Sequence, residues 1–248
     1  MIKRPKPERF RLRRTMMFMN AQKPGLIKDA YIYGCDSIML DLEDAVAENQ
    51  KDAARFSLYH ALTTIDYGDT EVIVRINGLD TPHWQEDIRV CVAGGADGIR
   101  IAKCESAQDV KTVEAHVLAA EREFGVEEGR TLLMAARAAG VQCFDTVFTD
   151  LDDEAGFEAE VRQNKAMGFD GKSLINPKQI RLVHEVFAPT AREVAQAEAM
   201  VSAFREAAAA GIGVFTVNGK MVDVAFIPGA ERTLRLAKAC GMYEGDLV

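Results

Sequence analysis

Residues 37–44 read SIMLDLED, and this stretch decides the fold class. Residues 37–42 are apolar except at Ser37 and Asp41, so they predict a strand that is covered on both faces, as in a parallel sheet. Similar short runs, rich in Val, Ile and Met, span residues 15–19, 71–77, 98–103, 131–134, 144–148 and 171–175. Helical runs lie between them. This alternation predicts an α/β fold of the TIM (β/α)8-barrel type.

The C-terminal end departs from the alternation. Residues 214–217 and 220–222 predict two short strands joined by Asn218-Gly219, which is typical of a type I′ turn. Pro228-Gly229 then leads into a helix over 230–240. We therefore expect a barrel over residues 1–211 and a C-terminal hairpin and helix over 212–248. This extension could act as a lid or a subunit contact, and a surface decoration is equally compatible.

The expected barrel has too few strands. Only residues 135–143 separate the fifth predicted strand from the sixth, whereas a parallel crossover needs roughly a dozen residues or more. We infer that at least one strand–helix unit is missing where Met134 meets Ala135. Either the sequence omits a segment or the gene is truncated, and the intact flanks favour omission.

Composition excludes several classes of protein. The chain has 248 residues, of which 48% are hydrophobic, and a net charge of −8, which argues against a general nucleic-acid binder. No run reaches the roughly 18 apolar residues of a membrane helix, and the basic N-terminus is not followed by an apolar signal core. The five cysteines include no C-x-x-C pair, so we expect no disulfide framework and a cytoplasmic location.

Acidic residues gather where the strand over 37–42 ends. Asp41 and Glu43 share one face by the two-residue period of a strand, and Asp44 follows. Active sites of TIM barrels lie at the carboxyl ends of strands. These three carboxylates are therefore site candidates, with a solvated loop and a helix N-cap as the alternative.

Three further residues could carry chemistry. Arg75 lies in an apolar strand, where a guanidinium needs a partner, and it could anchor a substrate acid or pair with Asp41 or Glu43. Lys103 ends another strand and could contact substrate or form an interior ion pair. Asp223, on the hairpin, could be a general acid or base delivered by a lid, or an exposed loop acid. No phosphate-binding loop, dinucleotide fingerprint or serine-hydrolase elbow occurs in the sequence.

Seven runs, taken in order, resemble the citrate lyase β-subunit group of the HpcH/HpaI aldolase superfamily. They span residues 13–18, 36–46, 74–77, 94–100, 144–148, 168–177 and 218–223, and the longest reads DSIMLDLEDAV. Singly, only the runs around 41–46 and 171–177 carry weight. Together they cover nearly the whole chain.

The resemblance implies a cytoplasmic, Mg²⁺-dependent TIM-barrel lyase that cleaves a 3-hydroxy acyl thioester. The substrate would be citryl-CoA or citryl–acyl carrier protein, giving oxaloacetate and an acetyl thioester, with citramalyl-CoA or malyl-CoA as alternatives. Such enzymes form trimers or hexamers, and a citrate lyase would also meet an acyl carrier protein and other lyase subunits. A class II pyruvate aldolase and an inactive, lyase-like scaffold remain as further alternatives.

The resemblance also assigns residue roles. Arg75 matches the arginine that holds the substrate, and Asp223 matches an aspartate that reaches the neighbouring subunit's site. Lys103 would add a substrate contact. Asp41, Glu43 and Asp44 would not contact the substrate themselves but would orient Arg75 or a metal-bound water. The family's two metal ligands, a Glu and an Asp, have no match in the sequence. Both would fall at the junction of Met134 and Ala135.

Overall fold

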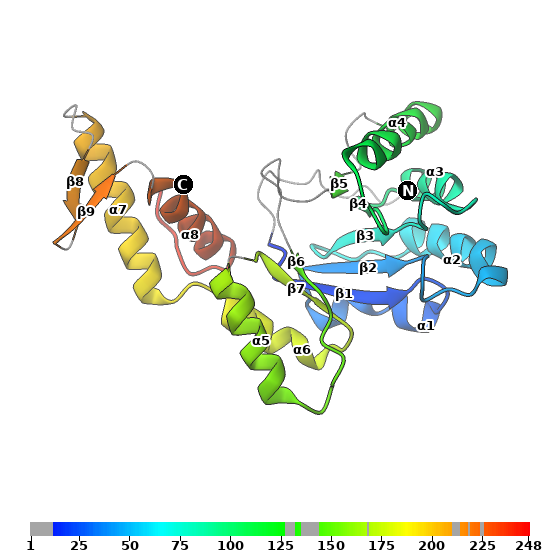
Figure 1. The fold of residues 1–248 in the computed structure, drawn as a ribbon, viewed down its shortest axis with the longest axis horizontal. Coiled ribbons are helices and arrows are strands. Elements are labelled where there is room, and N and C mark those ends of the chain that lie inside the picture. Colours follow the sequence, from blue (N-terminus) through cyan, green and yellow to red (C-terminus); the bar gives the residue numbers. More distant parts are fainter. Residues whose placement is uncertain are drawn as a thin grey trace. The chain divides into compact units, whose positions relative to one another are not determined.

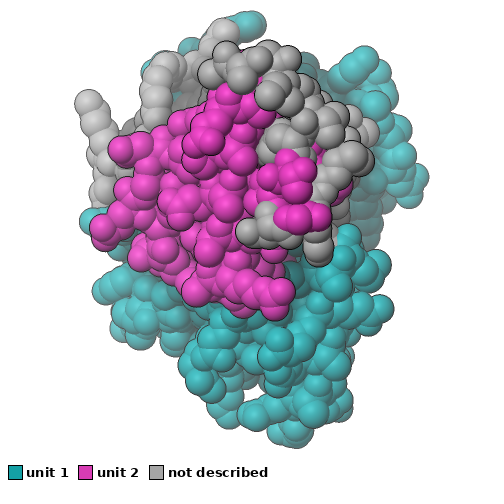
Figure 2. All heavy atoms as spheres, turned by 90° about the vertical axis from the view of Figure 1, so that its left-hand side faces the viewer, with its two compact units in different colours: residues 1–7, 13–186 teal, residues 8–12, 187–248 magenta. Residues whose placement is uncertain are grey.

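The computed structural model describes residues 12–126, 132–134, 144–167, 169–209, 214–217, 219–223 and 226–248. The chain divides into two compact units (Figure 2). Apart from the gaps in the described ranges, the first unit comprises residues 13–186, with a parallel sheet, and the second comprises residue 12 and residues 187–248, with a helix pair and a hairpin. We describe each unit by itself.

The first unit is built on a parallel sheet of seven strands (Figure 1). All seven predicted strands are present, and the α/β class is confirmed. The strands are β1 (Thr15–Asn20), β2 (Ser37–Asp41), β3 (Glu71–Arg75), β4 (Gly98–Arg100), β5 (Leu132–Met134), β6 (Phe144–Asp145) and β7 (Gly171–Leu174).

The sheet does not form a closed barrel among the described residues. Its strand order is β5-β4-β3-β2-β1-β7-β6. Strands β5 and β6 follow one another in the chain but lie at opposite ends of this order. Consecutive strands are neighbours in a (β/α)8 barrel, so the order leaves a position between β5 and β6 where one more strand would fit.

Helices connect the strands and begin and end at identifiable signals. They are α1 (Pro24–Ile27), α2 (Lys51–Thr64), α3 (Trp84–Gly94), α4 (Ala107–Phe124), α5 (Glu154–Met167) and α6 (Lys178–Phe187), with 3-10 turns η1 (Ala30–Tyr33) and η2 (Glu48–Gln50). A capping box formed by Ser106 and Asp109 opens α4. Thr81-Pro82 places a possible N-cap before a first-turn proline and so predicts a helix start there, but α3 begins only at Trp84. Helix α3 ends at Gly94, and Gly95, whose φ of 79° is left-handed, caps it.

Both faces of the sheet are buried, as the apolar strands predict. Met16, Met39 and Ile73 form a cluster on one face, with Phe18 and Phe144 packed against it. On these strands the alternate positions, which point to the opposite face, are also fully buried; they include Ile38, Leu40, Val72 and Val74.

The second unit contains α7 (Ala191–Ala209), β8 (Val214–Val217), β9 (Lys220–Asp223) and α8 (Ile227–Ala239). The predicted hairpin is confirmed: β8 and β9 pair antiparallel. Helix α8 begins at Ile227, earlier than predicted, because Pro228 lies in its first turn, where a missing N–H costs nothing. Buried residues of α7 pack against Leu234 of α8, and α7 lies in the second compact unit. The expected boundary between barrel and extension at residue 211 stays a prediction.

No helix in the described part of the chain is long and apolar enough to cross a membrane.

Candidate active site

A row of polar residues crosses the sheet where four strands end. Strand register pairs Asn20 of β1 with Asp41 of β2, Asp41 with Arg75 of β3, and Arg75 with Arg100 of β4. Residues paired in this way point to the same face of a sheet. Phe18, Met39 and Ile73 form the row directly before it on that face. A polar row therefore sits on an apolar floor at the carboxyl ends of the strands.

Arg75 is held by two carboxylates. Its Nε and Nη2 donate to the two carboxylate oxygens of Asp41 at 2.8 and 2.6 Å, and its Nη1 lies 2.9 Å from Glu43 Oε2. Burial acts to lower the pKa of Arg75, but the hydrogen bond and charge of Asp41, helped by Glu43, raise it overall. The ion pair left open by the sequence is thus present, and substrate binding by Arg75 stays a prediction.

The loop after β2 fixes these carboxylates in place. Asp41 accepts hydrogen bonds from the backbone N–H groups of Glu43 and Ala45, at 2.9 and 3.3 Å. Buried Lys51 donates from Nζ to the carbonyl oxygens of Leu42 and Glu43, both at 2.8 Å. Asp41 and Glu43 are 2% and 5% exposed. The loop therefore holds two buried negative charges next to Arg75.

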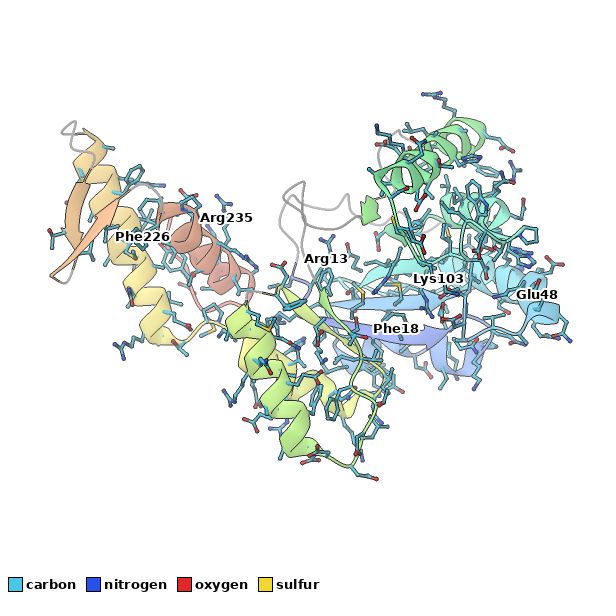
Figure 3. All side chains as sticks on the ribbon, viewed as in Figure 1. Arg13, Phe18, Glu48, Lys103, Phe226 and Arg235 are labelled. Atoms are coloured by element: carbon cyan, nitrogen blue, oxygen red, sulfur yellow. The ribbon has the colours of Figure 1, made fainter. Side chains whose placement is uncertain are left out.

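Lys103 approaches the same acids from the segment after β4 (Figure 3). Its Nζ lies 3.0 Å from Glu43 Oε1 and 3.7 Å from Asp44 Oδ1, while most of its side chain is exposed. The bond to Glu43 raises the pKa of Lys103. Its φ of 48° is left-handed, the only such non-glycine residue among those described. Such strain is often found at functional sites.

Arg100 is the residue that the sequence analysis missed. Its Cζ lies 5.5 Å from the centroid of the Phe18 ring, and Arg75 Cζ lies 5.2 Å from the same ring. No carboxylate among the described residues lies within ion-pair distance of Arg100; its recorded polar contact is Nη1 to Met16 Sδ at 3.9 Å. Burial lowers the pKa of Arg100, and the charge of Arg75 lowers it further. The sequence pattern could have indicated Arg100 as a candidate, because Arg100 ends an apolar strand just as Arg75 does.

Asp223 belongs to the second unit. It ends β9 and is paired in register with Val214 of β8. The structure describes its backbone but not its side chain. Its predicted role in acid–base chemistry stays a prediction.

The described residues do not fit a magnesium site. They contain no group of three or more His, Cys, Asp or Glu side chains that could hold a metal ion. Asp41, Glu43 and Asp44 cluster, but their oxygens face Arg75 and Lys103, whereas Mg²⁺ needs carboxylate oxygens of its own. Residues 135–143, beside the expected break at Met134–Ala135, lie outside the described residues, so that break stays a prediction.

Comparison with known proteins places this arrangement in a family. The family model described as HpcH/HpaI aldolase/citrate lyase matches residues 14–136 and 130–177. The chain belongs to the HpcH/HpaI aldolase/citrate lyase family. The resemblance seen in the sequence is thereby confirmed.

Two curated relatives of this family illustrate its range. The chain is 41% identical to the citrate lyase subunit beta of Leuconostoc mesenteroides subsp. cremoris, over 95% of this chain and 97% of that protein. It is 33% identical to a (3S)-malyl-CoA thioesterase of Cereibacter sphaeroides (strain ATCC 17025 / ATH 2.4.3), over 93% of this chain and 96% of that protein.

Solved structures of the family have the same fold. CitE from Mycobacterium tuberculosis, in complex with magnesium, acetoacetate and coenzyme A, is 26% identical, with a TM-score of 0.62 over 90% of this chain and 97% of that one. A citrate lyase from Burkholderia xenovorans LB400 gives a TM-score of 0.74 over 95% and 94% of the two chains; at 17% identity this likeness concerns the fold alone.

The alignments also locate a length difference. The alignment to the Leuconostoc subunit runs over 292 positions, and this chain has 248 residues, so at least 44 aligned positions have no residue here. The family model matches in two pieces, and the pieces meet at residues 130–136. This is also where β5 ends.

Proposed function

We propose that the protein is a carbon–carbon lyase that cleaves a 3-hydroxy acyl thioester, with citryl-CoA or citryl–acyl carrier protein as substrate. The observation that carries the proposal is the 41% identity to a citrate lyase subunit beta over nearly the full length of both chains. The polar row at the carboxyl ends of β1–β4 supports it, since TIM-barrel enzymes carry their chemistry there.

The reaction would use these side chains in distinct ways. Cleavage removes a proton from the 3-hydroxyl group, breaks the adjacent C–C bond and leaves an enolate on the thioester. Arg75 and Lys103 would bind the acid end of the substrate, with Asp41, Glu43 and Asp44 holding both cations in position. Asp223, carried on the hairpin as a lid, would transfer a proton at the enolate carbon, from the same subunit or its neighbour.

The magnesium ligands are proposed to lie outside the described residues. The M. tuberculosis structure holds magnesium and coenzyme A, and we propose the same pair for this family member. Since the described residues do not fit the metal, we propose that its ligands lie in a strand–helix unit between Met134 and Ala135. The strand order, the two-piece family match and the length of the alignment support that position.

Two alternatives follow from specific observations. The malyl-CoA thioesterase relative keeps malyl-CoA, and with it citramalyl-CoA, among the candidate substrates. The lack of a fitting metal site among the described residues favours an inactive scaffold if Met134 is joined directly to Ala135 in the cell. A homotrimer or hexamer, a partnership with an acyl carrier protein and a cytoplasmic location stay predictions.

One assay separates these possibilities. The 248-residue chain is compared with a chain in which the segment that the Leuconostoc subunit carries opposite the gap is inserted between Met134 and Ala135. Each is given citryl-CoA, citramalyl-CoA and malyl-CoA with Mg²⁺, and acetyl-CoA release is followed.

Each result has a clear meaning. Release of acetyl-CoA by either chain supports the lyase, and the preferred thioester identifies the substrate. Activity of the grafted chain alone supports a scaffold role for the 248-residue form. No turnover of any thioester by either chain contradicts the proposed function.

A further inference from the structure

Two guanidinium groups lie side by side in the polar row, and they differ in what they contact. Arg75 and Arg100 are register partners on β3 and β4, and the Cζ atom of each lies over the ring of Phe18. Arg75 uses Nε, Nη1 and Nη2 on Asp41 and Glu43. Arg100 contacts no carboxylate among the described residues.

An unpaired guanidinium in a half-buried position is costly. The charge of Arg100 loses hydration without gaining a bonded counter-ion among the residues that the structure describes. Here the cost is increased by the second positive charge of Arg75, which adds to the effect of burial in lowering the pKa of Arg100. Such an arrangement is unfavourable for the free protein, and a bound anion would relieve it.

We propose that Arg100 is a substrate-binding residue that determines specificity by binding a carboxylate of the keto-acid part of the substrate. The inference rests on the proposed function for the identity of that acid. It adds Arg100 to the roles proposed for Arg75 and Lys103. Arg75 is already paired with Asp41 and Glu43, whereas Arg100 has donors that meet no carboxylate among the described residues. A guanidinium suits a carboxylate because it donates two parallel hydrogen bonds.

The described neighbours of Arg100 are apolar where they contact it. Phe18 covers one side of the guanidinium and Met16 lies against Nη1, so an apolar wall limits how the group can be approached. Asp41 and Glu43 act on Arg100 only through their charge, without a bond. The donor edge of Arg100 is thus the part that a ligand can use.

Binding is measured directly, so the test does not depend on turnover. Isothermal titration calorimetry follows oxaloacetate, a keto dicarboxylate, and inorganic phosphate, with the 248-residue chain and its Arg100→Gln and Arg100→Lys variants. We expect Arg100→Gln to raise the Kd for oxaloacetate by at least about tenfold, since a charge-assisted bond is lost. The Kd of Arg100→Lys, which keeps the charge, should lie between that of the unmodified chain and that of Arg100→Gln.

The control is Arg89→Gln. Arg89 also stacks on a phenylalanine, Phe124, at 5.3 Å, but it pairs with Glu123 on the exposed surface of α3. Its removal should leave oxaloacetate binding unchanged. A purely structural role of Arg100 would show in the free protein, so the Tm without ligand is measured as well. We expect Arg100→Gln to keep or raise that Tm, because an unpaired charge is removed.

Three results would overturn the inference. The first is an oxaloacetate Kd that is the same in Arg100→Gln, or binding that cannot be measured in the unmodified chain. The second is a lower Tm of the ligand-free Arg100→Gln variant. The third is phosphate binding that is as tight as oxaloacetate binding and also depends on Arg100. The outcome is separate from that of the lyase assay. Oxaloacetate binding through Arg100 without thioester cleavage supports this inference and contradicts the proposed function. Thioester cleavage that is unchanged in Arg100→Gln supports the proposed function and contradicts this inference.

Discussion

Arg75 gives the sharpest residue-scale prediction about stability. Replacing it with Met removes the partner of Asp41 and Glu43, which are 2% and 5% exposed. Uncompensated buried charge is expensive, so we expect the free energy of unfolding to fall by about 3 kcal/mol. Urea denaturation measures it. Arg89→Met, which breaks an exposed pair with Glu123, should change stability little; an equal loss in both variants would contradict the buried-pair account.

Asp36 provides a prediction about pH. Arg14 donates to it from Nε and Nη2 at 2.9 and 2.8 Å, and His184 Nε2 lies 3.4 Å away. Burial acts to raise the pKa of Asp36, but the bonds from Arg14 and His184 bring it well below its usual range. A lowered pKa in the folded state adds stability above the unfolded pKa of about 4, and this is lost as the pH falls below that value.

The matching experiment compares the protein with Asp36→Asn by urea denaturation at about pH 7, 5 and 3. We expect the variant to be less stable at neutral pH and the difference to shrink at the acid end. Asp29→Asn serves as the control, because Asp29 pairs with Lys28 on the surface. A difference that is constant across the pH range would show that the ionised form of Asp36 is not what stabilises the fold.

Single residues also show how far the sequence could lead. The pairing of Arg75 with Asp41 or Glu43 could be anticipated, because a charge in an apolar strand must find a partner. The absence of a described carboxylate beside Arg100 could not be anticipated, since it depends on which side chains of other strands reach this residue. The left-handed backbone of Lys103 was equally hidden, because nothing in its residue type favours that conformation.

At the scale of the elements, Gly171 fixes how β7 joins β1. A Cβ at this position would lie 2.0 Å from the carbonyl oxygen of Arg13 and 2.8 Å from that of Arg14. These are backbone atoms of the strand's entry and cannot swing aside. We expect Gly171→Ala to lower the free energy of unfolding by about 2 kcal/mol or more, measured by urea denaturation. Gly229→Ala in α8, where the added methyl meets nothing within 4 Å, should cause no loss.

The sequence predicted which helices and strands are present better than it predicted the residues at which they begin and end. The seven strands were predictable because each is an apolar run in a two-faced core. Helix starts were less predictable where a proline could lie either before the helix or in its first turn. The pair Thr81-Pro82 suggested a start that the chain delays to Trp84, and Pro228 lies inside the first turn of α8 rather than before it.

At the scale of the whole molecule, the open strand order has a consequence for metal binding. The described part of the first unit holds seven parallel strands, with β5 and β6 at opposite ends of the order. The sequence predicted this shortage from the nine residues between two strands, but it could not predict the side chains that a missing unit would bring. If that unit carries the magnesium ligands, metal affinity must depend on it.

We therefore expect Mg²⁺ at millimolar concentration to leave the Tm of the 248-residue chain unchanged and to raise that of the chain grafted between Met134 and Ala135, because a ligand that binds only the folded state stabilises it. Thermal denaturation with and without Mg²⁺ measures the effect, and a graft whose acidic residues are replaced by their amides is the control. If the ungrafted chain responds to Mg²⁺ as strongly as the grafted one, the ligands lie within the 248 residues. The open position between β5 and β6 would then have no part in holding the metal.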